Sequence, residues 1–158
     1  MIAVNEKNRE LDFIRRTKDN YLSFKDCGKY EVTLLINSSL GLFIYPKEKY
    51  FDFIEDNFFE EEFVDEMLNC YKELNNDNDD RLKHFCRHLR NSIAHGNFDF
   101  LEEGSNYKND YNIIKSIIFE DYDEEGILVA KIEIPIKLLS KFFIKFADKM
   151  IEIINDYR

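Results

Sequence analysis

The sequence predicts a mainly α-helical fold that carries one small β-hairpin before its last helix. Three observations support this prediction. Apolar residues recur every three or four positions in several long stretches, the spacing of an amphipathic helix. The stretch 113–134 is instead rich in Ile and Val and is interrupted by an acidic turn. Only two prolines occur, and each marks the boundary of an expected element.

The first half of the chain predicts three helices. Residues 5–25 predict a polar helix, and residues 29–44 predict a largely buried helix that ends before Pro46. Residues 48–59 are aromatic and acidic, which indicates a short helix or an ordered loop. Residues 60–74 predict a further helix, because their apolar side chains are spaced three or four apart.

The second half predicts two more helices and the hairpin. The Asn- and Asp-rich run 75–80 predicts a loop that also supplies the N-cap of a helix over 80–95. A hairpin is expected at about 113–134, with its turn at an Asp-Glu-Glu-Gly sequence. Pro135 suits the first turn of a last helix at about 136–157.

Length and composition indicate one soluble domain over residues 1–158. The three cysteines, Cys27, Cys70 and Cys86, fit reduced thiols in a cytosolic protein. No signal-peptide pattern is present, and the longest apolar run, Val32–Tyr45, is too short and too polar to span a membrane. A cytoplasmic location without a membrane partner is therefore expected.

The net charge of −10 argues against broad nucleic-acid binding, which depends on Lys and Arg neutralising phosphates. The charge is unevenly placed, because residues 81–98 contain four basic side chains and no Asp or Glu. Such a window can attract an anionic substrate to one place on an acidic protein. The alternatives are a solvated basic helix face, or pairing of its arginines with acidic residues elsewhere in the chain.

The helix expected at 80–95 places all three histidines of the chain on one polar stripe. Successive helical residues advance by about 100°, so His84, His88, Asn91 and His95 lie within about 40° of one line. Arg87 and Arg90 flank this stripe. The expected core face carries Leu82, Phe85, Cys86, Leu89 and Ile93.

This stripe has the residue types needed to cleave RNA without a metal. The reaction needs a base for the 2′-OH proton, an acid for the 5′-oxygen and cations for the phosphate. Histidine can act as acid or base near neutral pH, and arginine donates to phosphate oxygens. His95 would lie in the last turn, before Gly96 at the expected end of the helix, where the helix dipole favours its protonated form.

Two alternatives remain for the histidines. They could simply be solvated on a polar face. His84 and His88, four residues apart, could also chelate zinc, but a further ligand would have to come from elsewhere in the chain. The sequence therefore predicts no metal and no cofactor.

One geometric problem concerns Arg90 and His95, which lie about 140° apart on an ideal helix. They can meet at one phosphate in two ways. Either the helix ends or changes pitch near Ala94, or the site is shared between two subunits.

The Arg-Asn-x3-His string formed by Arg90, Asn91 and His95 resembles the Arg-x4-His signature of the HEPN superfamily, many of whose members are metal-independent ribonucleases. Residues 30–42, followed by Pro-Lys-Glu at 46–48, are similar to the second helix of plasmid-borne and genomic HEPN family nucleases. In those proteins His-Leu-Arg-Asn-Ser-Ile-Ala-His-Gly follows downstream, as it does here. The match is patchy over residues 28–100 and fits again as a hairpin followed by a final helix.

The resemblance implies an all-α, HEPN-like bundle of four to five helices that forms a homodimer with a composite site at the dimer cleft. Arg90 would bind and orient the scissile phosphate of an RNA substrate. Asn91 would position the site by hydrogen bonding, and His95 would be the general acid/base. The implied products are a 2′,3′-cyclic phosphate and a 5′-OH.

The histidine stripe alone suggests that Arg87, His88 and His84 support substrate binding. The family also implies a possible toxin or anti-phage role with an antitoxin or regulatory partner. However, Asn97 replaces the Tyr that many HEPN toxins carry two residues after the motif His, so modification there by a nucleotidyltransferase antitoxin is not supported. The alternative function is a non-catalytic HEPN dimer module that binds RNA, a nucleotide or a protein partner.

Overall fold

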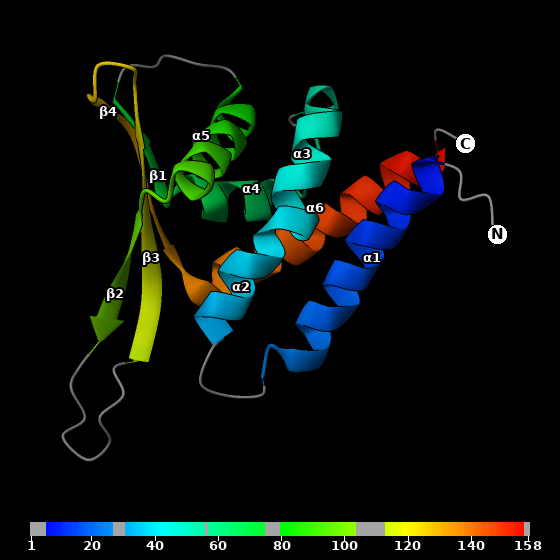
Figure 1. Ribbon diagram of the computed structural model, residues 1–158. Coiled ribbons are helices and arrows are strands. Elements are labelled where there is room, and N and C mark those ends of the chain that lie inside the picture. Colours follow the sequence, from blue (N-terminus) through cyan, green and yellow to red (C-terminus); the bar gives the residue numbers. More distant parts are fainter. Residues whose placement is uncertain (1–5, 27–30, 56, 75–79, 104–112, 157–158) are drawn as a thin grey trace. The chain divides into compact units, whose positions relative to one another are not determined.

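The computed structural model describes residues 6–26, 31–55, 57–74, 80–103 and 113–156 (Figure 1). The protein is mainly helical, as predicted, but it contains a four-stranded antiparallel sheet and not just one small hairpin. Two compact units make up the chain. The first unit combines residues 1–52 with 140–158, and the second unit comprises residues 53–139.

The helices of the first unit largely confirm the expected segments. The first and last helices of the chain lie within about two residues of their predicted bounds. Between them, a single helical stretch runs without interruption through Pro46. The first and last helices are α1 (Glu6–Phe24) and α6 (Ile136–Asp156). The stretch between them consists of α2 (Glu31–Ser39), η1 (Leu40–Ile44), α3 (Tyr45–Tyr50) and η2 (Phe51–Phe53).

The prediction that a helix ends before Pro46 is wrong, because η1 is a π-helical segment that leads directly into α3. Proline lacks a backbone N–H and clashes with the carbonyl four residues earlier in a regular α-helix. A π segment widens the turn just before the proline, and Pro46 then occupies the first turn of α3, where its missing donor costs little. The chain thus stays helical across a residue that usually stops a helix.

The first unit is held together by α1, η1 and α6. Helices α1 and α6 run antiparallel, since Tyr21 is 2.5 Å from Ser140 at one level and Lys18 pairs with Asp148 at another. Gly41 of η1 lies against α1, where a Cβ atom would come within 2.3 Å of the Thr17 hydroxyl. The centre is aromatic and is formed by Phe43, Phe142, Phe143 and Phe146.

The second unit contains two whole helices, the first residues of α6 and the sheet. Its elements are α4 (Glu61–Leu68), β1 (Tyr71–Glu73), α5 (Arg81–His95), β2 (Phe98–Glu103), β3 (Ile113–Tyr122) and β4 (Leu128–Pro135). The predicted hairpin is therefore confirmed as β3 and β4, and the predicted motif helix as α5. The predicted helix over 60–74 is wrong at its end, because α4 stops at Leu68 and the chain becomes β1. Strand β2 was not predicted.

The strands are ordered β1-β4-β3-β2, and all neighbours are antiparallel. The register aligns Tyr71, Ile132, Phe119 and Phe98 in one row across the sheet. Residues directly opposite each other in an antiparallel pair point to the same face. That face also presents Ile117 and Ile134, both fully buried, so it is the core face of the second unit.

Helix α5 packs against the core face beside β3 (Figure 1). Its buried residues include Leu82, Phe85, Cys86 and Leu89, as the helical spacing predicts. They also include His88 and Ser92, which were expected outside the core face. Ile93, in contrast, is only half-buried. The buried arc is wider than predicted because α5 contacts both the sheet and α4.

Three smaller expectations have mixed outcomes. Asp80 occupies the N-cap position of α5 but makes no side-chain capping hydrogen bond, and the rest of the expected loop at 75–79 lies outside the described residues. Cys86 is buried and Cys70 is half-buried, while Cys27 lies outside the described residues. Among the helices that the structure describes, none is long and apolar enough to cross a membrane.

Candidate functional site

The motif helix α5 ends at the residue that the sequence predicts. Gly96 follows it in the left-handed conformation with φ of 68°, which glycine adopts without strain. The amides of Gly96 and Asn97 bond back to the carbonyls of Ile93 and Ser92, a pattern that closes the C-terminus of a helix. His95 is therefore the last helical residue, and its side chain is exposed to solvent.

Two carboxylates on the sheet face α5. Glu73 of β1 and Asp121 of β3 each pair with Ala130 of β4, so all three residues lie in one row on the core face. Neighbouring strands are about 4.8 Å apart, which places the two acidic side chains on strands about 10 Å apart with a methyl group between them. This arrangement leaves space for one flat side chain between the carboxylates.

His88 occupies that space and contacts both acids. Its Nδ1 donates to Asp121 Oδ2 at 2.7 Å, and its Nε2 lies 3.1 Å from Glu73 Oε1. The side chains of His88 and Asp121 are each 7% exposed, so both are buried. The small Ala130, 1% exposed, permits this contact because a larger side chain in the middle of the row would meet the imidazole ring.

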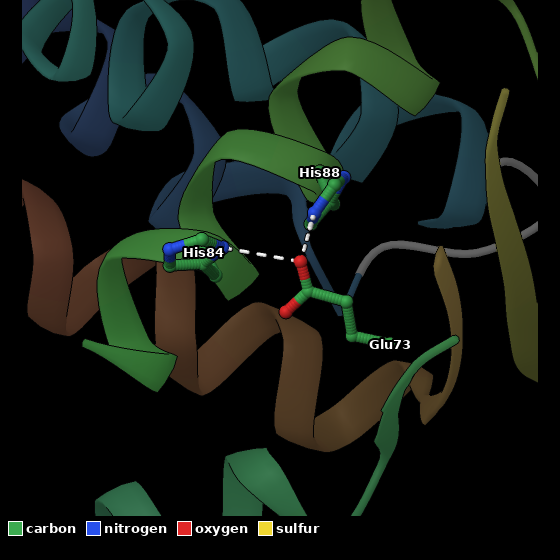
Figure 2. A group of neighbouring side chains, drawn as sticks. All are labelled: Glu73, His84 and His88. Carbon is green, nitrogen blue, oxygen red and sulfur yellow. Dashed lines mark hydrogen bonds and ion pairs between the residues drawn. The ribbon is translucent and has the colours of Figure 1, made fainter. Parts of the chain in front are cut away.

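His84 joins the same group from one helical turn earlier. Its Nδ1 lies 3.1 Å from Glu73 Oε1 and 3.1 Å from Arg87 Nη2. Figure 2 shows the carboxylate of Glu73 pointing between the two imidazole rings. The Tyr71 hydroxyl donates to the other oxygen of Glu73 at 2.7 Å. Burial raises the pKa of the Tyr71 phenol and its hydrogen bond to Glu73 raises it further, so the hydroxyl stays protonated.

A chain of hydrogen bonds connects His88 to the motif arginine. Asp121 Oδ2 accepts a second hydrogen bond from Asn91 Nδ2 at 3.1 Å. Asn91 Oδ1 in turn accepts one from Arg90 Nη1 at 3.1 Å. The amide of Asn91 is thus fixed at both ends, and it orients the guanidinium of Arg90.

The structure brings together most of the sequence-predicted site residues. His84, His88 and Arg87 meet around Glu73, and Asn91 and Arg90 are linked to them through Asp121. His95 is placed differently. Its side chain makes no hydrogen bond or ion pair with any of the described residues, and it faces solvent at the end of α5.

The end of α5 bears on how Arg90 and His95 could act on one phosphate. Helix α5 stays α-helical through His95 and ends at the Gly96 cap. No change of pitch occurs near Ala94, and the helix ends one residue after it. An end of the helix near Ala94 and a site shared between two subunits both stay predictions.

The basic window of the sequence meets acidic side chains in space. Residues 81–98 contain no carboxylate, but Glu73 and Asp121 are brought onto α5 by the sheet. These two acids offset part of the positive charge on the polar side of the helix. The attraction of this window for an anion is thus weaker than the sequence alone suggests.

Sequence reasoning missed Glu73 and Asp121. A signal for Asp121 was present, because Ile117, Phe119 and Asp121 alternate on the buried face of one strand. An acid at such a position needs a buried partner. Glu73 gave no comparable signal, since it lay in a segment predicted as helix.

Glu73, His84 and His88 each offer a ligand atom that can bind a metal ion. One ligand atom from each of Glu73, His84 and His88 lies within 4.8 Å of the other two. The sequence-based alternative of a zinc site at His84 and His88 required a ligand from another part of the chain, and Glu73 is in position to supply it.

A motif helix with Arg90, Asn91 and His95 at its C-terminal end is the feature that the HEPN resemblance predicts. The family model described as HEPN pEK499 p136 matches residues 1–157. The chain therefore belongs to the HEPN pEK499 p136 family, and the predicted membership of the HEPN superfamily is confirmed. The comparisons with curated proteins and with solved structures gave no significant match.

Proposed function

We propose that this protein is an endoribonuclease that cleaves RNA without using a metal ion in the reaction. The proposal assigns the chemistry to Arg90, Asn91 and His95, and to a homodimer that supplies Arg90 and His95 from different protomers. Support comes first from family membership, because HEPN domains are often ribonucleases. The observation that carries the proposal is the orientation of Arg90 by Asn91, at the same helix end where His95 is exposed.

The assigned roles follow from the chemistry of the side chains. Arg90 presents N–H donors to two oxygens of the scissile phosphate and offsets the charge that develops there. A base removes the proton of the 2′-OH, the 2′-oxygen attacks phosphorus, and the 5′-oxygen leaves with a proton from an acid. His95 is accessible and can serve as either group near neutral pH. The products are a 2′,3′-cyclic phosphate and a 5′-OH.

The buried network supports a positioning role for His88, and not a direct contact with RNA. His88 is enclosed by two carboxylates and cannot reach solvent without breaking both contacts. It acts through Asp121 and Asn91 to hold Arg90 in place. Arg87 is exposed and remains available to a phosphate on the polar side of α5.

A surface hollow beside the motif could receive part of a nucleotide. It measures about 270 Å³ and adjoins the end of α5 at Gly96 and Asn97. Asp99 and Glu120 line it together with Tyr122, so its charge suits a base or a ribose better than a phosphate. A base could stack on the tyrosine ring.

The first test is cleavage of total RNA and a tRNA pool by the wild type and three variants. Arg90→Ala and His95→Ala should each lose cleavage by about 100-fold or more, because each removes a group that acts in the transition state. Arg16→Ala is the matched control, since Arg16 is exposed on α1 and only pairs with Asp12. If the wild type is as inert as His95→Ala, the binding-module function replaces the nuclease. The net charge of −10 favours that alternative.

The shared site has its own test in mixed dimers. Arg90→Ala and His95→Ala are unfolded together, refolded as a mixture and assayed. With a site built from Arg90 of one protomer and His95 of its partner, each mixed dimer regains one intact site, and about a quarter of wild-type activity returns. A site contained within one chain predicts no recovery.

A further inference from the structure

We infer that Glu73, His84 and His88 form a binding site for a divalent transition-metal ion of the zinc type. The site goes beyond the proposed nuclease function and does not depend on it, because none of its three ligands contacts the RNA there and only His88 has a positioning role. Two histidines and one carboxylate are a common ligand set for zinc, and a fourth position stays open for water. Figure 2 shows these three side chains converging.

The distances fit such a site after small movements. Ligands of a tetrahedral zinc ion lie about 2.0–2.2 Å from it, and hence about 3.3 Å from each other. Glu73 Oε1 is 3.1 Å from His84 Nδ1 and 3.1 Å from His88 Nε2, so two of the three edges already match. The ligand atoms all lie within 4.8 Å, which exceeds the ideal edge by no more than about 1.5 Å. The side chain of His84 is 18% exposed and can rotate to close this difference.

Surrounding residues already hold the ligands as a metal site requires. A metal-binding imidazole usually donates its other N–H to a carboxylate, which fixes the tautomer and directs the free nitrogen to the ion. His88 donates from Nδ1 to Asp121 at 2.7 Å and thereby directs Nε2 toward Glu73. Tyr71 donates to the second oxygen of Glu73, while Oε1 faces the two imidazoles.

The two contacts of His84 Nδ1 also favour a cation at the centre of the cluster. At His84, Nδ1 cannot donate to Glu73 while it accepts from Arg87, which is always a donor. A metal ion that binds the lone pairs of His84 Nδ1 and His88 Nε2 satisfies both nitrogens and the carboxylate. Arg87 is exposed and can turn away from His84 when the ion binds.

The test is calorimetric titration of the full-length protein with zinc chloride, after treatment with EDTA and removal of the chelator. The wild type should bind one zinc per chain. Asp121→Asn should weaken binding about 10–100-fold, the usual effect of removing a residue that orients a ligand. His84→Ala and the isosteric Glu73→Gln should weaken it more. His95→Ala is the matched control, because it removes a histidine of the same helix outside the cluster and should bind like the wild type.

Cobalt provides a second measurement that identifies the ligands. Cobalt in this site should show visible absorption from nitrogen and oxygen ligands, without the charge-transfer band of a thiolate. Circular dichroism establishes that each variant is folded. The inference is overturned if the folded wild type binds no zinc, if His84→Ala and Glu73→Gln bind as tightly as the wild type, or if a thiolate band shows that cysteine is the ligand. RNA cleavage in excess EDTA is scored separately, so loss of the metal site does not decide the nuclease function.

Discussion

Asp121 is the residue whose substitution tests the buried network most sharply. Its Oδ2 atom accepts hydrogen bonds from both His88 and Asn91, and its side chain is 7% exposed. Asp121→Asn keeps the shape and can still accept both bonds through its amide oxygen. The substitution therefore removes mainly the negative charge of the acceptor.

The size of the effect follows from the two hydrogen bonds. A hydrogen bond to a charged group contributes about 1.5–3 kcal/mol, and a neutral one about 0.5–1.5 kcal/mol. Losing about 1 kcal/mol at each bond lowers the free energy of unfolding by about 2 kcal/mol. In a chain of this size that corresponds to a fall in Tm of about 4–8 °C. Asp121→Ala would also leave two donors buried without an acceptor, and should cost about 3–5 kcal/mol.

Urea unfolding measures this difference through the midpoint, provided that the slope is unchanged. Glu125→Gln is the matched control, because Glu125 is an exposed acid on the turn between β3 and β4. It should change stability by less than about 0.5 kcal/mol. If Asp121→Asn shifts the midpoint no more than Glu125→Gln, the charge of Asp121 does not hold His88 and Asn91, and the assigned network is wrong.

Three further substitutions test other parts of the account. Gly41→Ala should lower the free energy of unfolding in urea by about 1–3 kcal/mol, because its Cβ would lie 2.3 Å from the Thr17 hydroxyl. An unchanged urea midpoint would mean that α1 and η1 are not packed this closely. Ala130→Val should cost about 1–3 kcal/mol by crowding the imidazole between the two acids, and a neutral effect would argue against that placement. Burial and a hydrogen bond to a glutamate raise the pKa of Tyr50 from 10.0 to about 12. The stabilisation that comes from this raised pKa is fully present below pH 10 and is lost as the pH rises to about 12. Tyr50→Phe should therefore lose less unfolding free energy than the wild type over this pH range. An equal loss in both proteins would contradict the hydrogen bond assigned to Tyr50.

Local sequence patterns predicted the elements whose signals are local. The bounds of α1, α5, the β3–β4 hairpin and α6 follow from apolar spacing, from Pro135 and from the turn that ends at Gly126. Strand β1 was missed because its three residues, from Tyr71, continue the helical spacing of α4. It becomes a strand by pairing with β4, about sixty residues further along the chain, and such pairing depends on tertiary context that a short window cannot show.

In the candidate site, too, local sequence patterns predicted some features, and others depended on tertiary packing. Helical spacing correctly grouped His84, His88 and Asn91, which lie four and three residues apart on one helix. It could not show that His88 is buried, because burial there depends on the sheet that packs over the polar side of α5. Glu73 and Asp121 reach the helix only through the strand order β1-β4-β3 and through the small residue between them. Their positions beside α5 therefore could not be predicted without knowing the strand order.

The chemistry of the RNA ends that the protein produces tests most directly whether it cleaves RNA without a metal and through His95. The wild type and His95→Ala are incubated with total cellular RNA in excess EDTA, and the new ends are mapped. We expect cleavage by the wild type alone, leaving 2′,3′-cyclic phosphate and 5′-OH ends. Equal cleavage by both proteins, or 3′-OH and 5′-phosphate ends, would contradict a metal-independent reaction that uses His95.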